Sequence, residues 1–260
     1  MAVHGYQADL HIHTLLSPCG EIEMIPTLIV AAAVQAKLDI IAIADHNSCE
    51  NAASVIEAAA GSGIRVLPGM EVQSLEGVHL LCLFDTIEQA ETLQQAVYAT
   101  LPGLPAQSNE AEKKAASEVE KEFAGQIIVD ANDEFAGYCR QLLSLPTSLD
   151  IDEIWERTDS IGGILIPSHI DRKSTGLCDV LGMVPDTPEL TAVEVSRNID
   201  PAQALERYPS IGNRSIICNS DAHWLSAIGE RRTTFFLEHR NIAELKMACR
   251  GADGRRVERA

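Results

Sequence analysis

Short apolar runs alternate with amphipathic stretches along this chain. Most of the apolar runs are continuous, as in residues 38–44 (LDIIAIA), and polar residues do not alternate with the apolar ones. Continuous runs of this kind are typical of strands buried on both faces, as in a parallel sheet covered by helices. They predict strands at residues 8–12, 39–44, 65–72, 78–84, 126–129, 163–168, 192–196, 215–220 and 233–237.

Helix-like stretches fill the gaps between these runs. Pro26 opens a predicted helix that runs to residue 37, because proline is favoured at the first helical position. Further helices are expected at residues 49–60, 86–100, 109–124, 150–160, 201–208 and 242–250. The alternation of strands and helices predicts an α/β fold, a closed or nearly closed barrel formed by residues 1–260 as a single domain.

Residues 101–148 interrupt this alternation. They begin with a segment rich in proline and glycine, continue as a charged Ala/Glu/Lys helix and end in a polar stretch. We interpret them as an insertion or lid within the barrel domain. An ordinary helix with a long connection explains the pattern equally well.

The composition bears on the partners of the protein. The chain has 38 acidic and 20 basic residues, a formal net charge of -18, and 4% aromatic residues. These values argue against a duplex nucleic acid partner, which needs Lys and Arg on its phosphates. A small phosphorylated substrate remains compatible, because bound metal ions supply local positive charge. No apolar stretch reaches membrane-spanning length, so no membrane partner is expected. The composition does not indicate an oligomeric state.

The number and spacing of the cysteines bear on the cellular compartment of the protein. The seven cysteines are widely spaced and form no C-x-x-C pair. Reduced, mostly buried thiols in a cytoplasmic protein are therefore expected, and no signal-peptide pattern precedes the first strand.

Histidines mark the ends of the predicted strands. Residues 9–14 read DLHIHT, and because strand side chains alternate between faces, His11 and His13 point the same way. Six of the eight histidines lie at such ends: His11, His13, His46, His79, His169 and His223. Parallel strands deliver their carboxyl ends to one crevice, so this clustering predicts a site for several metal ions.

In order along the chain, these segments resemble the PHP family, named for its polymerase and histidinol phosphatase members. The matching segments are residues 9–14 (DLHIHT), 44–48 (ADHNS), 68–72 (PGMEV), His79, 167–169 (PSH) and 220–223 (SDAH). The resemblance implies a distorted (β/α) barrel of about seven strands. It also implies two to three divalent metal ions (Zn, Mn or Fe) at the carboxyl ends of the strands, and hydrolysis of phosphoesters.

The resemblance also implies a ligand set. The first metal would take His11, His13, Glu71 and Asp221, the second Glu71, His79 and His169, and the third His46 and His223. Asp45 is either a further ligand or a group that orients His46.

The loop that follows the H-x-H pair departs from the family pattern. Many members carry an aspartate here for the third metal, whereas this loop offers Cys19, Glu21 and Glu23. Glu23 could serve as a carboxylate ligand, or Cys19 as a thiolate that favours softer metals such as zinc. A weak or empty third site is the remaining alternative.

Arginines near the strand ends are candidates for binding phosphate. Arg172 and Arg197 follow two of the strands, and Arg231 and Arg232 lie further on. For each of them a salt bridge within an acidic protein is an equally good interpretation. Glu194 is either an outer-shell carboxylate or simply a polar residue at a strand end.

The predicted reaction is hydrolysis of a small phosphorylated metabolite or nucleotide by a metal-bound hydroxide. Asp221 or a nearby histidine would handle the proton, and His223 is a candidate donor to the leaving group. Two alternatives remain: a nuclease acting on short oligonucleotides, and a non-catalytic metal-binding regulatory module.

Overall fold

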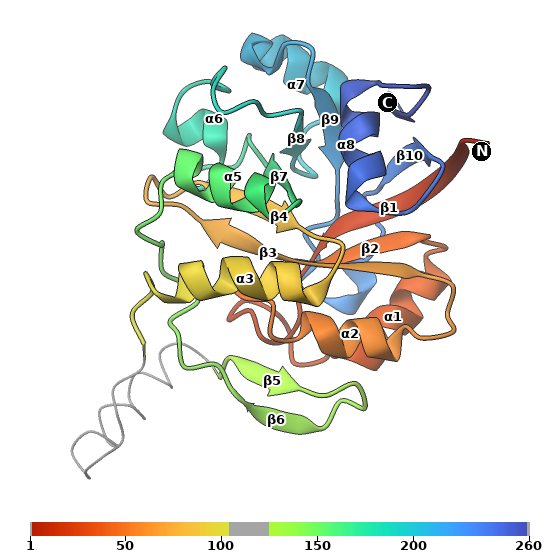
Figure 1. Ribbon diagram of the computed structural model, residues 1–260, viewed down its shortest axis with the longest axis vertical. Helices are drawn as coiled ribbons and strands as arrows, with labels where there is room; N and C mark the ends of the chain where they lie inside the picture. The colour runs from red at the N-terminus through yellow and green to blue at the C-terminus, as the bar shows by residue number, and fades with distance from the viewer. Residues whose placement is uncertain (1, 104–124, 259–260) are drawn as a thin grey trace.

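A curled sheet forms the centre of the molecule (Figure 1). The computed structural model describes residues 2–103 and 125–258. The strands of this sheet are β1 (His4–Ile12), β2 (Ile40–Ile43), β3 (Arg65–Gln73), β4 (His79–Leu83), β7 (Ile164–Pro167), β10 (Thr233–Leu237) and β11 (Arg256–Val257). They lie in the order β11-β10-β1-β2-β3-β4-β7. A separate parallel pair is formed by β8 (Ala192–Val195) and β9 (Ser215–Cys218).

Loop hydrogen bonds join the parallel pair to the curled sheet on both sides. Beyond β7, the amide of Ile170 donates to the carbonyl of Glu194 in β8 (2.9 Å). Beyond β9, the carbonyl of Ala222 accepts from the amide of His13 at the end of β1 (2.9 Å). The strands β1, β2, β3, β4, β7, β8 and β9 therefore follow one another around a distorted barrel, and the predicted α/β barrel fold is confirmed.

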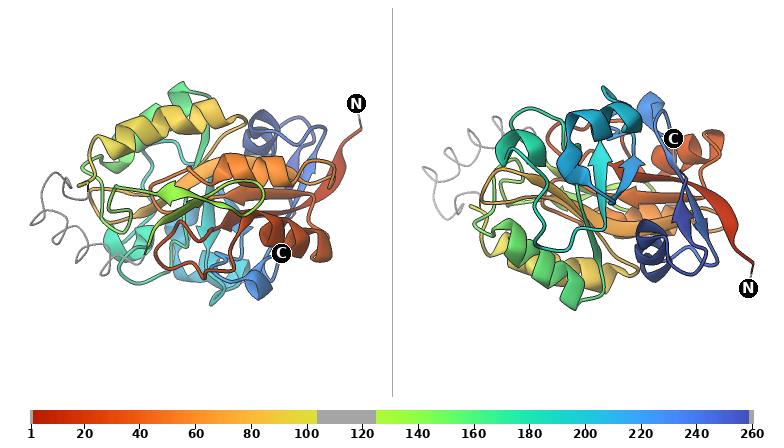
Figure 2. Two further views of the ribbon diagram at one scale, coloured as in Figure 1. Left: turned by 90° about the horizontal axis from the view of Figure 1, so that it is seen from below. Right: turned by 90° about the horizontal axis from the view of Figure 1, so that it is seen from above.

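Helices surround the strands (Figure 2). They are α1 (Pro26–Gln35), α2 (Ala52–Ala58), α3 (Ile87–Tyr98), α5 (Ile151–Ser160), α6 (Leu177–Val180), α7 (Pro201–Arg207) and α8 (Ile242–Arg250). Thr86, Asp150 and Asp200 begin α3, α5 and α7 with capping boxes. Among the helices of the described residues, none is long and apolar enough to cross a bilayer.

The burial of β2 explains why its sequence is a continuous apolar run. Ile41 and Ile43 belong to one apolar cluster together with residues of α1, α2 and α3. Ile40 and Ala42 belong to a second cluster, which includes residues of the other barrel strands and of α8. Because successive strand residues point to opposite faces, both faces of β2 are covered and neither has polar residues.

The expected parallel sheet is wrong at β4, which runs antiparallel to both β3 and β7. A tight turn joins β3 to β4, with Gly77 at φ 89° and the amide of Ser74 bonded to the carbonyl of Val78 (2.9 Å). An apolar run records burial on both faces and not strand direction, so the sequence did not reveal this reversal. As a consequence, His79 begins its strand at the same end of the barrel where β3 ends.

Part of the segment 101–148 packs below α2 in Figure 1. Here β5 (Ile127–Val129) and β6 (Phe135–Tyr138) form an antiparallel hairpin. The amide of Val129 donates to Asn51 Oδ1 (3.0 Å), and Ser54 Oγ donates to the carbonyl of Val129 (2.7 Å). The helix expected at residues 109–124 lies outside the described residues.

Candidate metal centre

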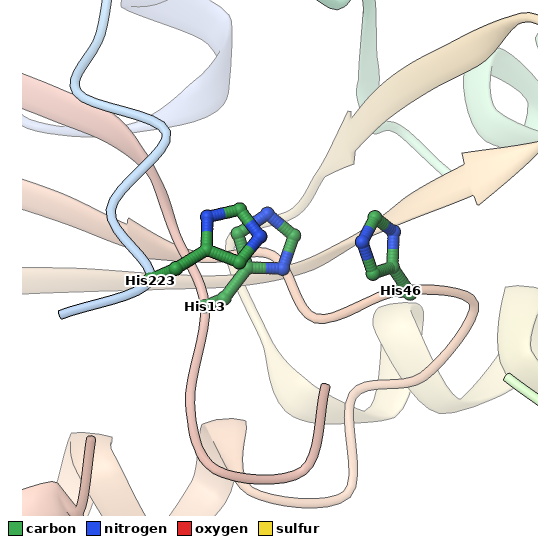
Figure 3. Close-up of side chains that lie close together, drawn as sticks. All are labelled: His13, His46 and His223. Carbon is green, nitrogen blue, oxygen red and sulfur yellow. The ribbon is translucent and has the colours of Figure 1, made fainter. Parts of the chain in front are cut away.

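One end of the barrel gathers six imidazoles: His11, His13, His46, His79, His169 and His223. The Nε2 atoms of His11 and His13 lie 3.1 Å apart, as the H-x-H spacing on one strand predicts. The rings of His13 and His223 are stacked with centroids 4.2 Å apart, although these residues come from opposite ends of the chain (Figure 3). The structure thus brings together all six histidines that the sequence placed at strand ends.

Glu71 lies at the centre of this group, with 1% of its side chain exposed. Its Oε1 is 3.0 Å from His169 Nε2 and 3.1 Å from His79 Nδ1. Its Oε2 is 3.1 Å from His46 Nδ1. Burial alone would raise the pKa of this carboxyl, but the neighbouring charges of His79 and His11 hold it well below its ordinary value. Glu71 is therefore an anion whose two oxygens face different groups of imidazoles.

Hydrogen bonds determine which nitrogen of His11 and His13 carries the proton. Ser17 Oγ donates to Asp45 Oδ1 (2.6 Å), so it accepts from His13 Nδ1 (3.0 Å). His11 Nδ1 in turn donates to Glu194 Oε2 (3.0 Å). In its neutral form, each of these two imidazoles therefore presents an unprotonated Nε2 to the centre of the site.

Asp221 adds a third acceptor at the same point. Its Oδ1 lies 3.3 Å from His13 Nε2 and 3.5 Å from His11 Nε2. Within the described part of the chain this buried oxygen has no hydrogen-bond partner, and neither has His169 Nδ1. Buried polar atoms are nearly always paired, so converging acceptors call for a cation. The donor set therefore fits a metal ion.

The electrostatics at His11 support the same conclusion. Burial acts to lower the pKa of His11, yet the carboxylates of Glu194, Glu71 and Asp221 outweigh it and raise the pKa well above its ordinary value. For His13 burial dominates, the charge of His223 adds to it, and the pKa is lowered well below 6.5. Carboxylates that stabilise a proton on His11 also stabilise a divalent cation at its Nε2, so protons and metal compete for the site.

The ligand atoms fall into three overlapping groups whose atoms all lie within 4.8 Å of one another. These are His11, His13 and Glu71; His46, Glu71 and His79; and His13, His46 and His223. The third group is the one drawn in Figure 3. Glu71 belongs to two of the groups, in keeping with the bridging position that the family resemblance implies.

The backbone is constrained where two of these side chains originate. His169 has φ 28° and Asp221 has φ 50°, values that non-glycine residues rarely adopt. Each residue directly follows a strand-end segment that is hydrogen-bonded to its neighbours. Such conformations cost free energy and persist where the surrounding structure and the function of the site require them.

The structure places two of the candidate ligands away from the imidazoles. Asp45 has both oxygens engaged away from the imidazoles: Oδ1 accepts from the Thr14 amide (2.7 Å) and Oδ2 from the Thr14 hydroxyl (2.8 Å). The hydroxyl of Ser17 donates a third hydrogen bond to this carboxylate. Asp45 therefore holds the loop after β1 in place, and through Ser17 it also orients the ring of His13. Glu23 is exposed, whereas its neighbour Met24 is completely buried.

Cys19 is the residue of this loop that reaches the imidazoles. Burial would raise the pKa of its thiol, but hydrogen bonds from His223 and His46 lower it to about 6. Cys19 also lines a cavity of about 390 Å³ together with His46, His79, Leu143 and Ser144. The other acidic residue of the loop, Glu21, is exposed like Glu23.

The arginines differ in their positions. Arg172 forms a hydrogen-bonded ion pair with Asp221 Oδ2 at the edge of the site, and 41% of its side chain is exposed. The guanidinium of Arg197 lies 5.1 Å from the ring centroid of Trp224. Arg231 and Arg232 donate to backbone carbonyls, at Ile199 (3.2 Å) and Ala36 (2.7 Å). Of these four arginines, Arg172 is therefore the one in contact with a candidate metal ligand.

Sequence reasoning missed two of the residues that support the ligands, Asn219 and Asp9. Glu194, which it left undecided, also accepts from Asn219 Nδ2 (3.0 Å), and Asn219 Oδ1 accepts from the Leu10 amide (2.8 Å). Asp9 binds the amide (3.0 Å) and the hydroxyl (2.6 Å) of Ser220. Burial raises the pKa of Asp9 to about 6. Asp9 precedes the H-x-H pair and Asn219 precedes Asp221. Their closeness to predicted ligands was the only feature of the sequence that could have indicated a supporting role.

Comparison with known proteins identifies the family. The family model described as "PHP domain" matches residues 9–162. The chain belongs to the PHP family. Among curated proteins, the PHP chain is 30% identical over 112 residues to the uncharacterized protein YqxK of Bacillus subtilis (strain 168). The alignment covers 39% of this chain and 27% of that relative, so the chain spans only part of its length.

Solved structures share the PHP fold. The lesion-specific endonuclease PfuEndoQ of Pyrococcus furiosus is similar with a TM-score of 0.71 at 18% identity, covering 98% of this chain and 58% of that one. A protein assigned as a metal-dependent phosphoesterase from Bifidobacterium adolescentis has a TM-score of 0.52 at 20% identity, covering 86% and 91%. At these identities the likeness concerns the fold.

The expectation that excluded duplex nucleic acid is wrong. Endonuclease Q, whose fold this PHP domain shares (TM-score 0.67, 18% identity, 97% of this chain and 58% of that one), has been solved with a 27-mer duplex carrying an abasic lesion at its active site. Net charge is a property of the whole chain, whereas a duplex is bound through local contacts. An acidic composition is therefore no ground for excluding such a partner.

The hydrogen bond between Glu194 and His11 gives a testable prediction. Replacing Glu194 with glutamine keeps the side-chain size but removes the charge that supports His11. Loss of such a supporting carboxylate lowers metal affinity by roughly 10- to 100-fold, and a competition titration against a chromophoric chelator measures this. Glu189→Gln is the control, because the Glu189 side chain is 75% exposed on the segment before β8. Equal affinities for the two variants would contradict the role of Glu194.

Proposed function

We propose that this PHP domain is a metal-dependent phosphoesterase that hydrolyses a small phosphorylated metabolite or nucleotide. The convergence of His11 Nε2, His13 Nε2 and Asp221 Oδ1, three acceptor atoms within 3.5 Å of one another, carries the proposal. Imidazole and carboxylate ligands suit Zn, Mn or Fe, and two to three such ions match the three ligand groups.

Each ligand has a proposed place. His11, His13, Glu71 and Asp221 would hold the first ion, Glu71, His79 and His169 the second, and His46 and His223 belong to a third site. Ions bound there would activate water as a nucleophile and offset the charge on the phosphoryl oxygens. Asp45 and Glu194 hold the ligands in position, and no ligand role is proposed for Glu23.

Arg172 is the proposed contact for substrate phosphate. Its ion pair with Asp221 holds the guanidinium at the edge of the site, and the remaining N–H donors can bind an anion. The same residue lines an open cavity of about 880 Å³, together with Lys173, Asn198, Arg207 and other residues. A phosphate at the metal centre would therefore leave room for the rest of the substrate on this side. Arg197 is a second, more distant candidate.

Two residues are proposed to handle protons. Asp221 lies beside the acceptor atoms and can receive a proton as the nucleophile forms. The pKa of His223 is raised, because its contacts with Cys19 and Asp221 outweigh burial, so it can give a proton to the leaving group. His223 Nδ1 donates to the carbonyl of Asp221 (2.9 Å), which leaves Nε2 as the reactive atom. Donor and ligand roles of His223 exclude each other, because both use Nε2.

We also propose that residues 101–148 are an insertion within a single domain, and that its described part, residues 125–148, covers part of the site. Leu143 and Ser144 line the cavity beside His46. Asn47, next to His46, donates from Nδ2 to the carbonyls of Leu143 (2.9 Å) and Leu145 (3.0 Å). These bonds tie the segment to the loop that carries a ligand.

A nuclease is the second candidate. The similarity to a lesion-specific endonuclease over 98% of this chain favours it. This PHP domain spans 58% of that endonuclease, so any nucleic-acid contacts made by the remainder have no counterpart in the compared region. A non-catalytic metal-binding module is disfavoured, because a structural metal site does not need six histidines and an adjoining cavity.

The test combines metal analysis with a substrate panel. Protein purified without chelator or affinity metal is analysed for bound elements. It is then assayed with added Mn against a phosphomonoester, a phosphodiester, nucleotides, a single-stranded oligonucleotide and a duplex with an abasic site. We expect bound metal, turnover that chelator abolishes and Mn restores, and a preference for small phosphoesters. Cleavage of oligonucleotides alone would favour the nuclease, and bound metal without any turnover would overturn both enzymatic proposals.

A further inference from the structure

Two cavities open beside the candidate metal centre. The larger, of about 880 Å³, is lined by Arg172, whose guanidinium is paired with Asp221. The smaller, of about 390 Å³, is lined by His46 and His79. Both cavities therefore adjoin the centre, and a substrate bound there can extend into either one.

The loop after β7 runs between the two cavities. Arg172 and Lys173 line the larger one, whereas Thr175 lines the smaller one. The amide of Arg172 donates to the carbonyl of His169 (2.8 Å), and the amide of Gly176 donates to the carbonyl of Arg172 (2.9 Å). A Cβ atom at Gly176 would lie 2.5 Å from the Arg172 carbonyl oxygen, so only glycine fits there. The loop is therefore tightly folded, and the cavities on its two sides are distinct.

The end of β3 contributes Gln73 to the smaller cavity. Gln73 lies two residues after Glu71 on this strand, so the two side chains point to the same face of the sheet. Gln73 is also the register partner of His79 on β4. Its carbonyl accepts a hydrogen bond from the amide of Thr147 (2.9 Å), which fixes the backbone at this point. The Gln73 amide thus shares a face with the metal ligands and lines the cavity beside them.

A buried hydroxyl group at this cavity has no partner. Thr175 lines the cavity, and its carbonyl accepts from the amide of His79 (3.0 Å). Its Oγ1 is buried and has no hydrogen-bond partner within the described residues. Buried polar atoms are nearly always paired, and an unpaired one costs free energy. Because the threonine side chain rotates about a single bond, a hydroxyl group bound in the cavity can supply the missing partner.

The smaller cavity differs from the larger one in charge. Of the described residues that line it, none is Asp, Glu, Lys or Arg, and its polar side chains besides the imidazoles include Gln73, Ser144 and Thr175. Charged side chains of both signs line the larger cavity. In the smaller cavity a charged group would lack an opposite charge, and a purely apolar group would leave the amide and hydroxyls unpaired. The lining therefore suits an uncharged group with hydroxyls.

We propose that the smaller cavity is a substrate subsite, which binds an uncharged, hydroxyl-bearing group such as a sugar or another polyol esterified to the phosphate. Gln73 and Thr175 determine its specificity by hydrogen-bonding to the hydroxyls. The volume of the cavity lies within the range of small-molecule sites. The inference rests on the proposed phosphoesterase function and narrows its substrates to phosphate esters of polyhydroxy alcohols.

A matched pair of esters tests the subsite. Glycerol phosphate and n-propyl phosphate have the same number of carbon atoms, but only the glycerol ester carries free hydroxyl groups. Both are assayed with added Mn, as monoesters and as methyl diesters, by release of the alcohol. We expect kcat/KM to be roughly 10-fold higher for the glycerol ester, because it alone can hydrogen-bond to the cavity.

Thr175→Val removes the unpaired hydroxyl and keeps the shape of the side chain. The preference for the glycerol ester should fall by roughly 5-fold, while kcat/KM for the propyl ester stays the same. The midpoint of urea denaturation should stay the same or rise, because no hydrogen bond is lost. A merely structural role for Thr175 predicts a lower midpoint and an equal effect on both esters.

Ser144→Trp tests the cavity by filling it. Ser144 is exposed and lines the cavity, so a tryptophan there can occupy the space without disturbing the core. Turnover of both esters should fall, whereas inhibition by inorganic phosphate, which needs only the metal centre, should be unchanged. Ser148→Trp is the matched control, because Ser148 is exposed on the same segment and lies outside the cavity lining.

The outcomes separate the subsite from the proposed function. Equal kcat/KM for the two esters, or turnover of other phosphoesters but of neither member of the pair, would overturn the subsite and leave the phosphoesterase standing. A preference that persists unchanged in Thr175→Val, or full turnover in Ser144→Trp, would overturn it as well. A wild-type protein that hydrolyses no phosphoester at all would refute the proposed function itself.

Discussion

Replacing Glu71 with glutamine should remove bound metal and hydrolytic activity together. Among the described residues, Glu71 is the one carboxylate whose oxygens lie within 3.6 Å of five imidazoles, those of His11, His13, His46, His79 and His169. A neutral amide offers one weaker acceptor and turns N–H donors toward protonated or metal-bound nitrogens. The stabilisation lost is about 4 kcal/mol, which corresponds to roughly a 10³-fold fall in turnover.

Elemental analysis and turnover on the preferred phosphoester measure this effect. Glu76→Gln is the matched control, because Glu76 lies in the turn between β3 and β4, five residues further on, and is exposed. It should keep both metal and activity. A Glu71→Gln protein that retained full metal content and turnover would refute the bridging role of this carboxylate.

Replacing Asp45 with alanine should strongly destabilise the protein. The buried Asp45 carboxylate accepts hydrogen bonds from the amide and hydroxyl of Thr14 and from the hydroxyl of Ser17. Hydrogen bonds to a charged group contribute about 1.5–3 kcal/mol each, and their loss leaves buried donors unpaired. We expect the free energy of unfolding to fall by about 3–5 kcal/mol, measured by urea denaturation of the metal-free protein.

The control for this variant is Asp39→Ala. Asp39 is half-buried and its carboxylate accepts one bond, from the Gln7 amide (2.8 Å), so the expected loss is about 1.5 kcal/mol, the low end of that range. The pair of variants also separates the two roles that the sequence left open for Asp45. If Asp45→Ala lost metal without losing stability, Asp45 would be a ligand and not the anchor of the loop.

Sequence alone was sufficient where the relevant geometry is local. His11 and His13 meet because strand residues two apart share a face. Strand ends at the same end of the barrel bring the other histidines to them, and His79 comes from the amino end of β4. The barrel followed from continuous apolar runs, which record burial on both faces. The observed boundaries agree with the predicted ones within a few residues, as for α8 (Ile242–Arg250) and β10 (Thr233–Leu237).

Sequence failed where a residue's role depends on distant partners. Glu194 binds His11 across 183 residues and Asp9 binds Ser220 across 211, so neither contact leaves a pattern in the neighbouring sequence. The direction of β4 depends on a turn and not on the apolar run. Two short strands were missed for a similar reason: β6 is mostly exposed and β11 has two residues, so neither produces a hydrophobic run.

The hydrogen bonds between Asp9 and Ser220 join two segments that are synthesised far apart in time. Asp221, which directly follows, leaves the ribosome about 210 residues after the H-x-H pair. At typical synthesis rates this delay is roughly 10 to 40 s. During that interval the growing chain carries His11, His13 and Glu71 but lacks the last acceptor and the strand that closes the barrel. Metal loading of the first site is therefore expected to follow completion of the chain, and products truncated before Asp221 should not bind metal there.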